Sequence, residues 1–144
     1  TDIECASMGY ALPTIIGAQF RDKNNDLICI TGDGSIMMNL QELHTISGYK
    51  IPAKIFILNN EGYHSIRQTQ HNYFNGREIG CGKNSGLTFP SFKKIANAFN
   101  FKYFRIRNIL DCKRKIKSIL NYKKALMCEV NIEKKQIFEQ RIVT

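Results

Sequence analysis

The stretch Gly32–Gly62 decides the fold of this chain. It opens with Gly-Asp-Gly-Ser at residues 32–35 and closes with Lys-Ile-Phe-Ile-Leu-Asn-Asn-Glu-Gly at residues 54–62. The apolar residues 27–30 before the first loop, and those before the Asn-Asn pair, each predict a buried strand. Apolar residues at helical spacing lie between the loops, so the sequence predicts two parallel strands joined by a helix. Loops at the carboxyl ends of neighbouring parallel strands form a crevice, the usual ligand site of an open α/β sheet.

The residue types of the two loops suit a metal-bridged diphosphate. The two glycines that flank Asp33 have no Cβ, so the backbone can turn tightly and approach an anion closely. A helix that begins near Ser35 would direct free N–H groups and its positive dipole end at that anion. Asp33 offers an anionic oxygen, Asn60 a carbonyl oxygen, and the backbone near Gly62 a third oxygen. Mg²⁺ accepts a few oxygen ligands of this kind when phosphates complete its octahedron.

Further elements extend this strand–helix–strand unit along the chain. The predicted helices cover residues 9–20, 63–70, 90–100 and a segment with the apolar stripe Cys112, Ile116, Ile119 and Leu120. The predicted strands cover residues 102–106 and 125–132. The first of these helices is expected to be buried, with Gly17 allowing close packing. The alternation of strands and helices predicts one α/β domain.

The motifs resemble those of thiamine diphosphate enzymes. Gly-Asp-Gly, followed by Asn-Asn at residues 59–60 at the end of an apolar strand, is similar to the cofactor motif of that family. Similarity to the C-terminal, diphosphate-binding domain of acetolactate synthase-like enzymes extends to residues 8–13, 16–18, 40–43 and 66–70. The resemblance implies an α/β fold, a three-layer sandwich with a mostly parallel sheet and helices on both faces. It implies a thiamine diphosphate-binding domain at residues 1–132 and a C-terminal tail at residues 133–144.

The resemblance also implies which residues hold the cofactors, thiamine diphosphate and Mg²⁺. The implied metal ligands are Asp33, Asn60 and Gly62. The implied cofactor-binding residues are Ala6, Ser7, Met8, Gly32, Asp33, Gly34, Ser35, Asn60, Gly62, Tyr63, His64 and Ser65. In the family, a backbone carbonyl at Ala6 accepts from the cofactor's amino group and Met8 supports its bent shape. Residue type alone would make Met8 an ordinary core methionine.

The activity implied by the resemblance is decarboxylation of a 2-keto acid such as pyruvate, followed by protonation or carboligation. The glutamate that activates the cofactor comes from a pyrimidine-binding domain of the same or a partner subunit, and no residue here corresponds to it. We therefore expect no turnover by this chain alone. We expect the chain to be part of a longer polypeptide or a subunit of a split 2-keto acid decarboxylase. A homodimer or homotetramer is expected, and FAD, where present, would be held by other domains.

Two positions depart from the common pattern of the family. His64 stands where glycine is frequent, and it either contacts phosphate or substrate or only caps a turn. Thr69 stands where synthases that favour 2-ketobutyrate usually carry Trp, and the chain has no Trp. This argues against a housekeeping role in branched-chain amino-acid synthesis. The long loop at residues 71–90 contains two basic residues, Arg77 and Lys83, which either contact an anionic substrate or are solvated. The same loop contains Cys81, a candidate reactive thiol.

Composition narrows the remaining classes of function. The 144 residues are enough for one domain, 43% of them are hydrophobic, and no apolar run approaches a membrane span, so a soluble cytoplasmic protein without a membrane partner is expected. Five cysteines without close pairs predict reduced thiols. The net charge of +9 would suit binding of nucleic acid, but no nucleic-acid-binding motif accompanies this charge. We therefore expect no nucleic-acid partner. A non-enzymic nucleotide or phosphate-binding domain on a similar sheet remains the alternative.

Overall fold

The computed structural model describes residues 7–23 and 25–136. Its four strands form one parallel sheet in the order β1-β2-β4-β3. The strands are β1 (Ile28–Gly32), β2 (Lys54–Asn59), β3 (Lys102–Ile106) and β4 (Leu126–Asn131). All four strands point the same way because helical crossovers return the chain between them, so their carboxyl ends lie along one edge of the sheet.

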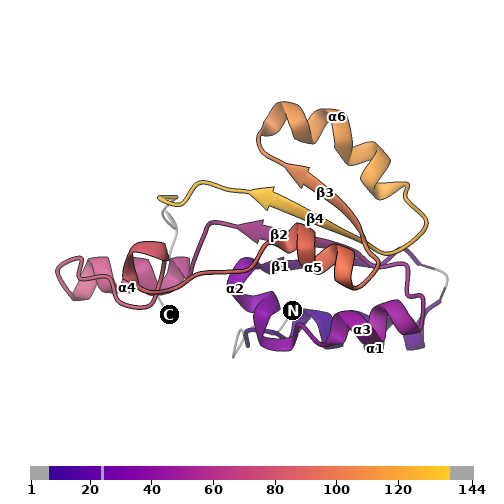
Figure 1. The fold of residues 1–144 in the computed structure, drawn as a ribbon, viewed down its shortest axis with the longest axis horizontal. Helices are drawn as coiled ribbons and strands as arrows, with labels where there is room; N and C mark the ends of the chain where they lie inside the picture. The colour runs from indigo at the N-terminus through magenta and orange to yellow at the C-terminus, as the bar shows by residue number, and fades with distance from the viewer. Residues whose placement is uncertain (1–6, 24, 137–144) are drawn as a thin grey trace, which may run out of the picture.

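Helices cover both faces of the sheet and complete three layers (Figure 1). The α-helices are α1 (Ala11–Arg21), α2 (Asp33–Ile36), α3 (Glu42–Gly48), α4 (His64–Tyr73), α5 (Phe92–Ala98) and α6 (Ile109–Leu120). Two 3₁₀ turns, η1 (Met37–Asn39) and η2 (Lys83–Ser85), lie between them. Helices α1, α3 and α5 pack on one face of the sheet, and α6 packs on the other. The predicted α/β sandwich is confirmed.

The core is divided between the two faces of the sheet. The larger cluster joins α1, α3 and α5 to the sheet, and its fully buried members include Leu43, Ile46, Ile55 and Ile57. A smaller cluster of Ile106, Ile119, Leu126 and Cys128 lies under α6. None of the helices in the described part of the chain is long and apolar enough to cross a membrane.

Strand β1 differs from its prediction because it is buried on one face only. Cys29 and Thr31 face the larger core, whereas Ile28 and Ile30 are 52% and 65% exposed. Helix α6 packs over β3 and β4, and within residues 7–23 and 25–136 no helix covers the outer face of β1. A central strand and an edge strand have similar apolar sequences, so composition alone does not separate them.

Three predicted helices also differ in detail. The crossover between β1 and β2 is a helix in three pieces, α2, η1 and α3. Only Leu12 and Ile15 are buried in α1, and a Cβ on Gly17 would meet nothing within 4 Å, so Gly17 does not mediate close packing. In α6, Leu120 is 37% exposed, because it lies at the margin of the stripe that buries Ile119.

Candidate functional site

Asp33 joins the two loops at the carboxyl ends of β1 and β2. It is the first residue of α2, with Gly32 as the N-cap, and it is 2% exposed. The Gly34 amide donates to its Oδ1 at 2.7 Å, and the Gly62 amide donates to its Oδ2 at 3.1 Å. The helix therefore begins at Asp33 rather than near Ser35. The two loops that the sequence predicts to form a crevice are in direct contact through this one carboxylate.

The surroundings of Asp33 oppose its charge. Burial raises the pKa of Asp33, and the hydrogen bonds from the Gly34 and Gly62 amides only partly offset this effect. A carboxylate that is buried and short of positive charge gains stability from a nearby cation.

Asn60, in the second of these two loops, supplies a further buried oxygen. Its Oδ1 is buried and has no hydrogen-bond partner, whereas its backbone carbonyl accepts from the Arg67 guanidinium at 3.0 Å. A buried carbonyl oxygen without a donor is costly unless a ligand satisfies it. The donor set of these two loops, a buried carboxylate and an unsatisfied amide oxygen, fits a small divalent cation.

One glycine in each loop, Gly34 and Gly62, is required by contacts within the protein. A Cβ on Gly34 would lie 2.1 Å from Cε1 of Tyr63. Gly62 has φ +153°, and a Cβ there would lie 2.0 Å from the backbone oxygen of Cys81. The sequence-based explanation, close approach to an anion, is therefore incomplete: Gly34 first makes room for the ring of Tyr63.

The N-terminal loop is attached to the same region. Ser35 Oγ accepts from the Gly9 amide at 3.0 Å, and the Asn39 side chain donates to the Gly9 carbonyl at 3.0 Å. Ser7 is exposed, and Met8 is 43% exposed, so the alternative of a core methionine is wrong. Ala6 lies outside the described residues. The contacts of Ser35 and Asn39 with Gly9 hold the loop at residues 7–9 beside the helix start that contains Asp33.

The family that matches this chain is described as thiamine pyrophosphate enzyme, C-terminal TPP binding domain, and the match covers residues 2–130. The chain belongs to this family. It is 40% identical over 116 residues to an acetolactate synthase large subunit of Porphyra purpurea, a match of 81% of this chain and 19% of the relative. An acetolactate synthase of Arthrospira platensis is 32% identical over 126 residues, or 88% of this chain and 21% of the relative.

A third relative, a probable acetolactate synthase large subunit of Methanococcus aeolicus, is 36% identical over 115 residues. That match covers 80% of this chain and 19% of the relative. The chain thus spans about a fifth of the length of the curated relatives it matches. Membership of the thiamine pyrophosphate enzyme family confirms the resemblance inferred from the Gly-Asp-Gly and Asn-Asn motifs.

In this thiamine pyrophosphate-binding domain, the residues after the second loop begin α4. Tyr63 is the N-cap of α4, its amide donates to the Cys81 carbonyl at 2.9 Å, and its ring meets Phe89 edge to face at 6.0 Å. His64 is half-buried and lines a hollow of about 880 Å³ that Arg67 also lines, whereas Ser65 is exposed. His64 therefore lies beside open space at the start of the helix.

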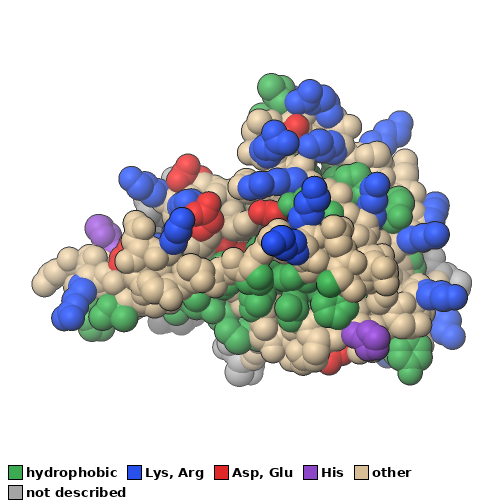
Figure 2. All heavy atoms as spheres, viewed as in Figure 1, with side chains coloured by type: hydrophobic (Ala, Val, Ile, Leu, Met, Phe, Trp, Pro, Cys, Tyr) green, Lys and Arg blue, Asp and Glu red, His purple; other side chains and the backbone are tan. Residues whose placement is uncertain are grey.

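The loop after α4 contains the remaining predicted candidates. Arg77 is exposed, and Lys83 lies on the rim between two hollows. Cys81 is fully buried, which does not suit a reactive thiol. The four described cysteines are free, and burial raises the pKa of Cys29 to about 11 and that of Cys128 to about 12, as expected for unreactive thiols. Lys and Arg side chains are spread over the viewed face, above all over α6 (Figure 2).

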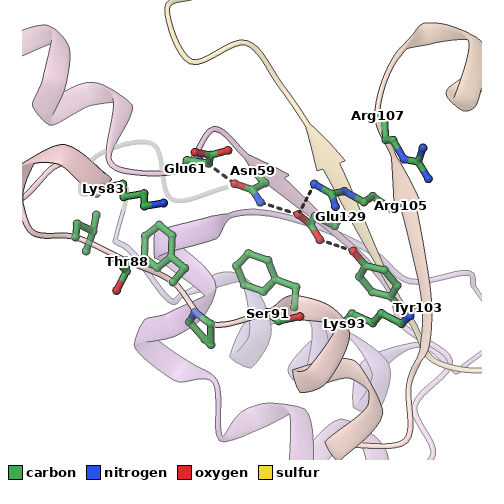
Figure 3. A pocket seen from close by; sticks show the side chains of 14 residues that line it. Asn59, Glu61, Lys83, Thr88, Ser91, Lys93, Tyr103, Arg105, Arg107 and Glu129 are labelled. Atoms are coloured by element: carbon green, nitrogen blue, oxygen red, sulfur yellow. Dashed lines mark hydrogen bonds and ion pairs between the residues drawn. The ribbon is translucent and has the colours of Figure 1, made fainter.

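A second group of polar residues, which was not predicted from the sequence, lies beside the loop that follows β2. Glu129, Asn59, Tyr103 and Arg105 line a cavity of about 640 Å³ between the strand ends and α5 (Figure 3). Glu129 is 7% exposed although it follows a run of apolar residues in β4. A glutamate within an apolar strand could have indicated this group from the sequence, because a charged residue is almost never buried unless it is paired.

The raised pKa of Asp33 predicts a pH-dependent effect on stability. Between the ordinary pKa of 3.8 and the higher native value, the folded chain keeps a proton that the unfolded chain has lost. Raising the pH through this window therefore lowers the contribution of Asp33 to the free energy of unfolding. We expect the Asp33→Ala variant to gain stability relative to the unmodified chain as the pH rises from about 4 to about 7. Denaturant unfolding of both proteins measures this difference, and a constant difference across the range would contradict it.

Proposed function

We propose that this chain is the cofactor-binding part of a thiamine diphosphate- and Mg²⁺-dependent enzyme of the acetolactate synthase type. The enzyme would decarboxylate a 2-keto acid such as pyruvate and join the remaining fragment to a second carbonyl. One observation carries the proposal: the buried Asp33 carboxylate joins both loops, and the second loop holds the unsatisfied Oδ1 of Asn60. Family membership and the acetolactate synthase relatives support the same conclusion.

The chain's own residues would bind and orient the cofactors. Asp33, the Asn60 amide oxygen and the carbonyl of Gly62 would hold Mg²⁺, and the metal would in turn fix the diphosphate. The backbone of Gly32–Ser35 and the start of α4, at Tyr63, His64 and Ser65, would flank the phosphates. When bound, thiamine diphosphate supplies carbanion stabilisation for the loss of carbon dioxide from a 2-keto acid.

The N-terminal loop would orient the other end of the cofactor. Ser35 and Asn39 hold Gly9, and this contact would place Ser7, Met8 and the preceding Ala6 against the cofactor. The exposure of Met8 supports this role, since a thioether side chain adapts to an apolar ligand surface.

The proposal extends to the organisation of the whole enzyme. Residues 1–132 would form the cofactor domain, with residues 133–144 as a tail. A pyrimidine-binding domain of the same or a partner subunit would supply the activating glutamate, in a cytoplasmic homodimer or homotetramer. FAD, where the enzyme uses it, would be held by domains outside this chain.

Calorimetric titration tests the proposal directly. Thiamine diphosphate is titrated into the chain with MgCl₂ and with EDTA, and thiamine monophosphate and ATP serve as matched ligands. We expect binding that requires both the metal and the diphosphate, and no release of carbon dioxide from pyruvate by the chain alone. Metal-independent binding, or preferred binding of ATP, would favour the nucleotide-binding alternative. Pyruvate turnover by the isolated chain would show that no separate glutamate domain is needed.

A further inference from the structure

Glu129 is the centre of a hydrogen-bonded network that crosses three strands (Figure 3). Its Oε1 accepts from the Asn59 side-chain amide at 2.7 Å and pairs with the Arg105 guanidinium at 3.7 Å. Its Oε2 accepts from the Tyr103 hydroxyl. Burial and then this hydrogen bond raise the pKa of Tyr103, so the phenol stays protonated and remains a donor. The network links the carboxyl end of β2 to β4 and β3.

Asn59 transmits this network to the loop that carries Asn60 and Gly62. Its Oδ1 accepts from the backbone amide of Glu61 at 3.0 Å. Glu61 has φ +58°, a left-handed conformation that is unfavourable for a residue with a side chain. The hydrogen bond from its amide therefore helps to hold a strained residue between two proposed metal ligands.

The carboxylate of Glu129 also decides how the Asn59 amide is turned. An ionised carboxylate accepts hydrogen bonds and cannot donate them, so it requires the NH₂ group of Asn59 on its side. The carbonyl oxygen of Asn59 must then face the Glu61 amide. A neutral side chain at residue 129 would impose no such orientation.

We propose that Glu129 is a positioning residue that acts through Asn59 to fix the backbone of Glu61, and with it the oxygens of Asn60 and Gly62. The link to metal binding rests on the proposed function, whereas the restraint on the Glu61 amide does not. Neighbouring asparagines thus differ in their contacts, since Asn59 Oδ1 accepts from the Glu61 amide, whereas Asn60 Oδ1 is buried without a hydrogen-bond partner.

A reciprocal exchange of side chains tests the proposal. Asn59→Asp keeps an acceptor for the Glu61 amide but places a second carboxylate against Glu129. In the double variant Asn59→Asp with Glu129→Gln, the side-chain amide at residue 129 donates to the carboxylate at residue 59, so the donor and the acceptor have exchanged positions. We expect Asn59→Asp to weaken Mg²⁺-dependent binding of thiamine diphosphate by roughly 10- to 100-fold, the usual cost of losing a partner of a metal ligand. The double variant should recover most of this loss.

Hydrogen exchange at the Glu61 amide gives a readout that needs no cofactor. We expect faster exchange in Asn59→Asp and recovery in the double variant, with no change in Glu42→Gln, a control that removes a carboxylate from α3. Thermal unfolding of each variant separates this effect from a general loss of stability.

The measurements separate the role of Glu129 from the proposed function. Unchanged Glu61 exchange in Asn59→Asp, or a double variant as impaired as the single one, would overturn the role of Glu129. If the unmodified chain shows no metal-dependent binding, the proposed function fails, and the exchange data still decide the restraint on Glu61. If Asn59→Asp does not fold, Glu129→Gln alone decides, because loss of the fixed amide orientation should still accelerate Glu61 exchange.

Discussion

Replacing Asp33 with alanine is expected to abolish metal-dependent binding of thiamine diphosphate. The substitution removes the anionic ligand proposed for Mg²⁺ and the acceptor of the Gly34 and Gly62 amides at the same time. Loss of a residue that merely supports a metal ligand costs about 10- to 100-fold in affinity, so loss of this ligand should cost at least about 100-fold. Calorimetric titration with and without MgCl₂ measures the change.

The Asp33→Asn variant is the matched comparison for this prediction. Asparagine keeps the shape of the side chain and one acceptor for the loop amides, but it carries no charge. We expect it to retain more of the fold than Asp33→Ala while losing the metal dependence. Unchanged metal-dependent affinity in both variants would mean that the crevice between the two loops is not the metal site.

Replacing Gly62 with alanine is expected to destabilise the domain strongly. The new Cβ would lie 2.0 Å from the backbone oxygen of Cys81 and 2.7 Å from the Arg67 side chain. The backbone at φ +153° is also one that residues with a Cβ rarely adopt. Since a backbone carbonyl cannot move away as a flexible side chain can, we expect a loss of roughly 3 kcal/mol or more in the free energy of unfolding.

Gly17 provides the control for this substitution. A Cβ on Gly17 would meet nothing within 4 Å, and the residue lies inside α1. Alanine in a helix interior is favoured over glycine by roughly 0.5–1 kcal/mol, so Gly17→Ala should stabilise the chain slightly. Urea unfolding of the two variants side by side measures both effects. Equal stability of the two would show that the loop at Gly62 can rearrange freely.

Local sequence patterns were sufficient for the strands and for the meeting of the two loops. Residues 102–106 contain aromatic and β-branched side chains, which favour strands, and β3 has these bounds. A helical crossover between two strands predicts that they are parallel, and sequential strands are usually neighbours in the sheet. Strands β1 and β2 do pair in this way, so the Asp33 loop and the Asn60 loop meet at the same edge.

The remaining features depend on contacts between distant segments. Glu129 and Asn59 are neighbours because β4 pairs with β2, and the sequence between them gives no sign of that pairing. Gly34 is required by the ring of Tyr63, a residue that follows β2, on the other side of the helical crossover in the sequence. The exposure of Ile30 depends on how far α6 extends over the sheet. Strand and helix periodicity describe one segment at a time and contain none of this information.

The half-covered sheet also has a practical consequence for work with this chain. Ile28 and Ile30 project from an edge strand, where unpaired backbone groups and apolar side chains together promote aggregation. These two side chains point to the face of β1 opposite Cys29 and Thr31, away from the larger core. Lysine or glutamate at both positions would improve solubility by blocking association between edges, and it would change no residue of the two loops that hold Asp33 and Asn60.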